Sequence, residues 1–173
     1  MTEVADLDEI ETDDTDLSFQ EENLDDMYLS FSVANEEYGI GIVFVTEILG
    51  MQRIMAVPDV PDHIRGVINL RGKVIPVMDV RMRFGLPWVA YDERTVIIVL
   101  EINNVLTGLV VSRVSEVLNI APDQIEAPTG QHTNGEDIVS GLGKHDNRVC
   151  FLLDIPELLQ QRLDDEDDIK ASV

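Results

Sequence analysis

The chain is short of cysteine, of long hydrophobic runs and of basic residues, and each shortage excludes a class of protein. Its one cysteine, Cys150, cannot build a disulfide framework or a cysteine-rich zinc site. The longest apolar runs, such as 96–100, are far below the roughly 18 residues that a membrane span needs. No basic stretch followed by an apolar one occurs at the N-terminus, so no secretory signal is predicted. These absences favour a cytoplasmic protein without direct membrane insertion.

Basic residues are scarce, because 12 Lys and Arg stand against 34 Asp and Glu, for a formal net charge of −22. The acids gather at the ends: residues 1–26 hold twelve of them and no Lys or Arg, and residues 164–168 hold five more. Like charges repel and bury little surface, so we predict disordered acidic tails at 1–26 and 164–173 around one folded domain at 27–163. Alternatively, the apolar residues scattered among the N-terminal acids let that tail dock on a basic partner surface.

Polar groups that could converge for catalysis are also few. His63, His132 and His145 lie in separate predicted loops and lack the spacing of metal-binding histidines. Cys150 lies in an alternating apolar run, which predicts a buried thiol and not a nucleophile. Asp79 directly follows a predicted strand, where a carboxylate is well placed to cap a short helix. The sequence therefore predicts no enzyme, no cofactor and no metal site.

Short β-strand patterns dominate the middle of the chain. Leu29, Phe31 and Val33 alternate with serines, as in a half-buried strand, and residues 96–102 are apolar on both faces, as in a strand between two layers. Tight turns are predicted at 35–37, 71–72, 103–104 and 145–147, where Asn, Asp or Gly tolerates a positive φ. Eight or nine short, closely spaced strands predict small barrels, because closure removes exposed strand edges.

Only two short helices are expected. Residues 42–49 are ambiguous: their β-branched content favours a strand, but Ile42, Val45 and Leu49 share one helical face and Gly50 is suited to end a helix. We interpret this stretch as a short helix. The second helix is expected from 155 to about 162, capped by Asp154.

One segment is rich in positive charge and is interpreted as a local positive surface. As a nucleic-acid site it is weak, because no aromatic stacking platform accompanies it and acidic tails would compete with phosphate. Arginine also suits partner carboxylates and interface hot spots, so protein contact is the preferred interpretation and a nucleic-acid-binding small barrel is the alternative. The residues are Arg65, Arg71, Lys73, Arg81 and Arg83, with Asp79 as the only acid among them.

Residues 69–81 resemble the signature Asn-Leu-Arg-Gly-x-x-x-Pro-x-x-Asp-Leu-Arg of the CheW family of chemotaxis coupling proteins. Further matches occur in the same order as in the family, before the signature at 37–40 and 45–48 and after it at 114–118 and 141–143. The resemblance therefore covers about residues 27–162. It implies an all-β fold of two intertwined, five-stranded SH3-like barrels with short helices, a C-terminal helix and a hydrophobic groove between the barrels.

The resemblance also implies a function, which is that of a non-enzymatic adaptor. Such an adaptor couples the cytoplasmic tips of chemoreceptors to the regulatory domain of the histidine kinase CheA, in arrays near the inner membrane surface. No cofactor and no nucleic acid take part. The alternative within the same family is a scaffold for another sensory pathway, such as surface motility or second-messenger control.

The family pattern finally assigns protein-interaction residues. Three fall in the stretch interpreted as a short helix, five in and just before the signature loop, and two in the second barrel. Each has a structural alternative: the glycines could serve positive φ or tight packing, one valine could belong to the core, and the asparagine could satisfy loop backbone groups. In chain order, the assigned residues are Val45, Glu47, Ile48, Gly66, Asn69, Leu70, Arg71, Gly72, Gly108 and Val114.

Overall fold

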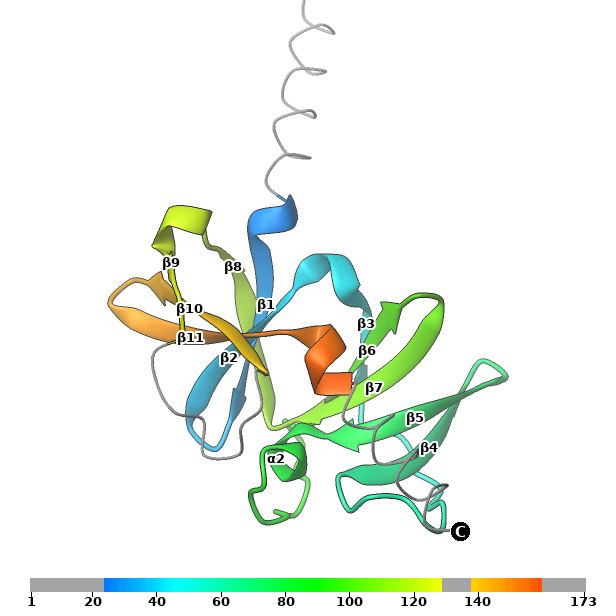
Figure 1. Cartoon of the computed structure of the whole chain (residues 1–173). Helices are drawn as coiled ribbons and strands as arrows, with labels where there is room; N and C mark the ends of the chain where they lie inside the picture. Colours follow the sequence, from blue (N-terminus) through cyan, green and yellow to red (C-terminus); the bar gives the residue numbers. More distant parts are fainter. Residues whose placement is uncertain (1–23, 129–137, 160–173) are drawn as a thin grey trace, which may run out of the picture.

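The computed structural model describes residues 24–128 and 138–159, and these form two β-sheets that pack against each other (Figure 1). Short 3-10 turns η1 (Leu24–Asp26), η2 (Ile42–Phe44) and η3 (Pro122–Gln124), the single-turn helix α2 (Val80–Arg83) and helical residues 155–159 connect or follow the strands. The predicted all-β fold with few short helices is confirmed. The strands are β1 (Met27–Val33), β2 (Glu36–Gly41), β3 (Val45–Gly50), β4 (Ile64–Leu70), β5 (Lys73–Asp79), β6 (Val96–Ile102), β7 (Val105–Val111), β8 (Arg113–Asn119), β9 (Ile125–Glu126), β10 (Val139–His145) and β11 (Arg148–Leu153).

The two sheets are intertwined, because the N-terminal hairpin joins the sheet made by the end of the domain. One sheet has the order β8-β1-β2-β11-β10-β9, and the other has the order β3-β6-β7-β5-β4. The parallel pair β2–β11 places Tyr38 beside Phe151 and links strands from the two ends of the sequence. The first sheet has six strands where five were expected, because the two-residue strand β9 extends its edge.

The five-stranded sheet curls, so its opposite edges approach each other. Met55, which follows β3, makes an isolated antiparallel bridge with Val67 of β4, with backbone N–O distances of 2.8 and 2.9 Å. Glu47 of β3 also forms an ion pair with Arg71 in the β4–β5 turn. Since β3 and β4 are the first and last strands of this sheet, both contacts close it toward a barrel.

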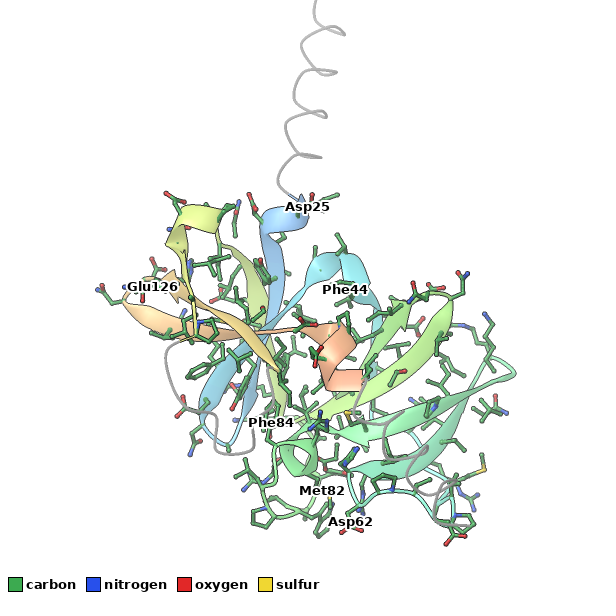
Figure 2. All side chains as sticks on the ribbon, viewed as in Figure 1. Asp25, Phe44, Asp62, Met82, Phe84 and Glu126 are labelled. Atoms are coloured by element: carbon green, nitrogen blue, oxygen red, sulfur yellow. The ribbon has the colours of Figure 1, made fainter. Side chains whose placement is uncertain are left out.

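Most of the buried apolar surface lies between the two sheets, in a cluster that we call the shared core. Phe31 and Ile40 enter it from one sheet, Met78 and Leu100 from the other, and Leu158 from the C-terminal helical turn; all are at most 1% exposed. Figure 2 shows side chains filling this space. Each sheet adds a small interior cluster of its own. Because the largest cluster belongs to both sheets, neither sheet has a sufficient core alone.

Residues 42–49 do not form a helix, and that prediction was wrong. The structure has a single 3-10 turn and then β3, which pairs antiparallel with β6. Burial along β3 alternates, with Val45, Glu47 and Leu49 half-buried and the residues between them exposed. The stretch forms a strand because its residues are rich in β-branched side chains and because β6 offers an edge for pairing. These two effects outweigh the helical spacing of three apolar residues.

All four predicted tight turns are present as two-residue hairpin turns with positive φ at both central residues, but the first lies at 34–35 and not at 35–37, because Glu36 and Glu37 already belong to β2. The pairs are 34–35, 71–72, 103–104 and 146–147. A type I′ turn requires this conformation, because its twist matches that of the flanking strands. Asn occupies at least one position in three of the four turns, and Arg71 with Gly72 forms the fourth.

Both predicted helix caps are also present. The Asp79 Oδ1 accepts a hydrogen bond from the Met82 backbone N–H at 3.3 Å, and the Asp154 Oδ1 accepts one from the Glu157 N–H at 3.1 Å. The helix after Asp154 is described as far as residue 159. Its predicted remainder, the predicted acidic tails apart from 24–26, and His132 lie outside the described residues.

The conformation of Gly66 generates a first prediction, since its φ is +141° and an added Cβ would lie 2.1 Å from the Met55 carbonyl oxygen. We expect Gly66→Ala to lower the free energy of unfolding by about 3 kcal/mol or more, because strain and a backbone clash add together. Urea unfolding measures this loss. Gly50→Ala is the matched control, because nothing lies within 4 Å of its added Cβ. Equal stability of the two variants would contradict the conclusion that position 66 requires glycine.

Candidate protein-interaction surface

The ion pair between Glu47 and Arg71 marks the end of the five-stranded sheet. Arg71 occupies the first position of a positive-φ turn, and its side chain is 72% exposed, whereas that of Glu47 is 25% exposed. The Asn69 Oδ1 accepts a hydrogen bond from the Gly72 N–H at 2.9 Å and holds the turn. We call Glu47, Ile48, Asn69, Arg71 and Gly72 the hairpin-tip surface.

This surface has the chemistry of a protein contact. A guanidinium held by a half-buried carboxylate loses little conformational freedom when a partner binds, so more of its binding energy is retained. Exposed apolar side chains accompany these charges along the chain: Ile48, next to Glu47 on β3, is 45% exposed, and Val74, two residues after the turn, is 65% exposed. Charged and apolar groups side by side are typical of interface hot spots.

The remaining assigned residues are not part of the hairpin-tip surface. Gly66 and Gly108 are buried, and a Cβ at Gly108 would lie 2.9 Å from the Ile97 Cγ2, so both glycines permit close packing. Val45 packs against the shared core and Leu70 against the interior cluster of its own sheet. Val114 lies on β8 in the other sheet, also packed on the shared core. For these residues the structure provides a structural role.

The linear basic segment does not form one positive surface, so that interpretation was wrong. Arg71 lies at the tip of the β4–β5 hairpin, but Arg81 and Arg83 lie on α2, beyond the other end of β5. Arg83 is 6% exposed, and its Nε donates to the Leu158 carbonyl oxygen at 3.2 Å. The Arg65 Nη1 contacts the Met82 Sδ at 3.6 Å. A β-hairpin separates in space what the sequence places together.

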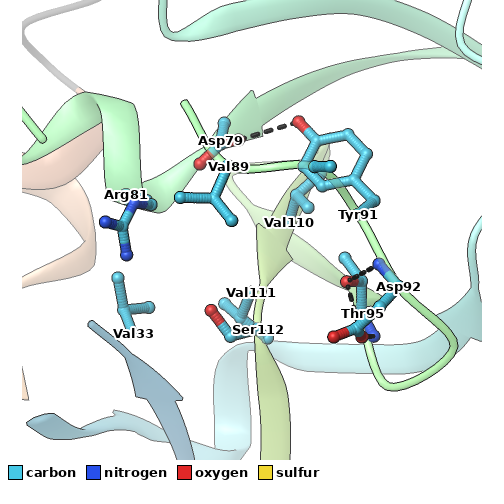
Figure 3. Close-up of a pocket in the computed structure, with 11 residues that line it drawn as sticks. Val33, Asp79, Arg81, Val89, Tyr91, Asp92, Thr95, Val110, Val111 and Ser112 are labelled. Carbon is cyan, nitrogen blue, oxygen red and sulfur yellow. Dashed lines mark hydrogen bonds between the residues drawn. The ribbon is translucent and has the colours of Figure 1, made fainter. Parts of the chain in front are cut away.

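A pocket that sequence reasoning missed lies where the two sheets meet (Figure 3). Val33 of β1 and Val110 of β7 line it, together with the loop from Val89 to Thr95. On one side the Tyr91 hydroxyl donates to the Asp79 Oδ2 at 2.7 Å. The Asp92 N–H donates to the Thr95 Oγ1 at 2.9 Å, and this Asp-x-x-Thr spacing is the local signal that could have predicted an ordered loop.

Burial and the bond to Asp79 both act on Tyr91. The pKa of Tyr91 is raised to about 12, chiefly by desolvation. The hydrogen bond to the Asp79 carboxylate and the negative charge of that carboxylate act in the same direction. Asp79 itself is 3% exposed. It accepts from both the Tyr91 hydroxyl and the Met82 N–H, so the carboxylate connects the loop to α2.

No catalytic chemistry emerges from the described parts of the chain. Cys150 is 1% exposed, and burial raises the pKa of its thiol to about 12, which keeps it protonated and confirms the predicted buried thiol. Across residues 24–128 and 138–159, no three His, Cys, Asp or Glu side chains gather as a metal site would require. Within the same ranges, no helix has the length and apolar character to cross a membrane.

Comparison with known proteins adds a consistent set of similarities. The model of the CheW-like domain family matches residues 27–163. The chain is 42% identical to the chemotaxis protein CheW of Klebsiella aerogenes over 133 residues, which is 76% of this chain and 80% of that protein. It is 33% identical to CheW of Bacillus subtilis, covering 76% and 85%. The crystal structure of the scaffolding protein TtCheW from Thermoanaerobacter tengcongensis superposes with a TM-score of 0.73 at 35% identity, covering 78% of this chain and 92% of that one.

The raised pKa of Tyr91 predicts a loss of stability in alkali. Because the folded state holds this proton more tightly than the unfolded state, the stabilisation is complete below pH 10 and is lost as pH rises through about 12. Cys150 acts in the same direction. We expect Tyr91→Phe to reduce the slope with which the free energy of unfolding falls with pH in alkali. At neutral pH the variant should lower the free energy of unfolding by about 1–3 kcal/mol. It should also remove the tyrosinate absorbance that appears at the highest pH. An unchanged slope in urea unfolding between pH 10 and about 12 would refute this account.

Proposed function

Because this chain belongs to the CheW-like domain family, we propose that it couples methyl-accepting chemoreceptors to the histidine kinase CheA in the signalling arrays that control motility. The family is one of non-catalytic chemotaxis adaptors, so the chain is an adaptor and not an enzyme. The observation that carries the proposal is the extent of the match, which spans residues 27–163. We place the protein in the cytoplasm at arrays near the inner membrane surface.

The proposed partners are the regulatory domain of CheA and the cytoplasmic tips of the receptors. The hairpin-tip surface supports one of these contacts, because Arg71 projects from a turn and its guanidinium is oriented by Glu47. We propose Arg71 as the central contact and the exposed Ile48 of β3 as a further, apolar contact. Gly66, Gly108 and Val114 act indirectly in this proposal, since they shape the backbone and the shared core.

The mechanism follows from rigid scaffolding. An adaptor that holds a receptor on one face and the kinase on another makes their meeting effectively intramolecular and raises the local concentration. The shared core ties the two sheets into one body, so both partners bind a single rigid unit. A signal then passes as a change in the relative stability of two assembly states, because a ligand shifts an equilibrium only by its differential affinity.

The two alternatives differ in how well the geometry supports them. A scaffold for another sensory pathway would use the same surfaces with other partners, and binding to the chemotaxis kinase separates the two cases. A nucleic-acid-binding barrel is disfavoured, because the basic segment divides between the hairpin tip and α2 and the chain carries a net charge of −22.

Charge reversal at Arg71 tests the proposal. We expect Arg71→Glu to weaken binding to the kinase regulatory domain or to the receptor tip at least about tenfold, measured by calorimetry with each partner. The thermal midpoint should hardly move, because an exposed ion pair contributes at most about 1 kcal/mol. Lys144→Glu is the matched control, since it makes the same charge change and also removes an exposed ion pair, that with Glu126.

The double variant Arg71→Glu with Glu47→Arg distinguishes contact from support. It restores an ion pair between these positions but leaves a carboxylate where the partner meets the guanidinium. If binding stays weak, Arg71 contacts the partner, as proposed. If binding returns, or if Arg71→Glu binds both partners as Lys144→Glu does, Arg71 is not the contact. Failure of the unaltered protein to bind either partner would overturn the proposed function itself.

A further inference from the structure

A polar depression beside the pocket of Figure 3 collects arginines from three separate elements. Arg81 comes from α2, Arg94 from the loop before β6, and Arg113 from the start of β8. Arg81 and Asp92 line both hollows, so the two form one continuous surface. We call Arg81, Arg94 and Arg113 with their surroundings the arginine depression. Ser32, Ala34, Asn35, Asp92 and Ser112 complete its lining.

The arginine depression is positively charged and is not neutralised from within the described structure. It holds three of the 12 basic residues of a chain with a net charge of −22. Its one carboxylate, Asp92, already accepts hydrogen bonds from the backbone N–H groups of Arg94 at 2.8 Å and Thr95 at 3.2 Å. No ion pair joins any of the three arginines to a carboxylate within 24–128 and 138–159; the Arg81 Nε donates to the Pro87 carbonyl oxygen at 2.7 Å.

An aromatic and apolar rim adjoins these charges. Trp88 is 49% exposed and Val89 is 51% exposed, although both side chains are apolar over most of their surface. The Trp88 ring lies edge-on to Tyr91 with 6.0 Å between the ring centroids. Val89 and Tyr91 line the pocket that continues into the arginine depression. An occupant that fits this surface must carry both acidic and apolar side chains.

Residues 1–23 have that composition and are attached at a suitable place. They contain ten acids and no Lys or Arg, with Leu7, Ile10, Leu17 and Phe19 among the acids. The described chain begins at Leu24 with η1, and β1 then runs from Met27 to Val33, at the edge of the pocket. The ends of this seven-residue strand lie about 20 Å apart. Residues 14–23 span at most about 33–36 Å when fully extended, so Asp14 and the acids before it can reach the Val33 end of β1, and the covalent link raises their effective concentration there.

We propose that residues 1–23 dock in cis on the arginine depression, with their carboxylates on Arg81, Arg94 and Arg113 and their apolar residues against Trp88 and Val89. Charge complementarity and the apolar residues among the acids favour this occupant over the C-terminal acids at 164–168, which form a shorter run of five. The docking is independent of the adaptor role.

Trp88, the only tryptophan, reports directly on this contact. In the full chain at low salt we expect Trp88 to be shielded from acrylamide. The combined variant Arg94→Gln and Arg113→Gln should raise the quenching constant at least about twofold, as should high salt, because screening weakens exposed charge pairs. The matched control is Lys144→Gln with Arg148→Gln, which removes two exposed positive charges from the other hairpin. Equal quenching in all variants and salts would overturn the proposal.

Further variants of the full chain identify the occupant. Asp13→Asn, Asp14→Asn and Asp16→Asn together should release Trp88, whereas neutralising the acids at 164–168 should not. Release by the C-terminal variant alone would assign the wrong segment to the site and refute the proposal. Quenching that depends on protein concentration would show docking between copies and refute docking in cis. Unchanged thermal midpoints confirm that each variant is folded.

Discussion

The parallel pairing of β2 with β11 is the contact on which the rest of the structure depends. It inserts the N-terminal hairpin into the sheet formed by the end of the domain, and so it interlocks the two halves of the chain. Close approach of the strands requires Gly39, where a Cβ would lie 2.9 Å from the Cys150 Sγ and 3.1 Å from a Leu152 methyl carbon. Because strands distant in sequence must meet before the shared core is complete, this part of the fold is non-local and is expected to form late.

Interlocking supplies the single body that the proposed binding of two partners requires. Each sheet alone has only a minor apolar cluster, but the shared core makes the two sheets one body. The proposed contacts lie on features that add little to stability, such as the exposed guanidinium of Arg71. Stability and recognition therefore rest on different residues. Partner specificity can change through the turns while the core remains constant.

Local physics made much of the fold predictable from the sequence. Asn103 and Asn104 take positive φ as a type I′ turn demands, Asp79 and Asp154 cap the helices that follow them, and alternation placed β1 correctly. The stretch 42–49 was misassigned because its apolar spacing fits a helix, and only pairing with β6 makes it a strand. Membership of an edge strand is a tertiary property that the local pattern does not contain.

The candidate sites likewise depend partly on local sequence and partly on tertiary contacts that the sequence does not show. Family resemblance pointed to Arg71 and Glu47 but not to their ion pair, which exists because the sheet curls and brings its edge strands together. The arginine depression was invisible in the sequence, since Arg81, Arg94 and Arg113 are far apart along the chain and meet only at the junction of the sheets. Conversely, the basic residues between 65 and 83 lie apart in space, because the β4–β5 hairpin within this segment places them at opposite ends of the strands. Charge clusters on a β-protein follow strand ends and turns, not sequence neighbours.

This geometry also makes the two charged sites electrically independent. Arg71 precedes β5 and Arg81 follows it, and a seven-residue strand separates its ends by about 20 Å. That separation exceeds the Debye length of about 8 Å at physiological ionic strength, so a charge gained or lost at one site is screened at the other. An acidic segment that occupies the arginine depression therefore leaves the hairpin-tip surface unaltered, and coupling between the sites must pass through the packed strands rather than through the solvent.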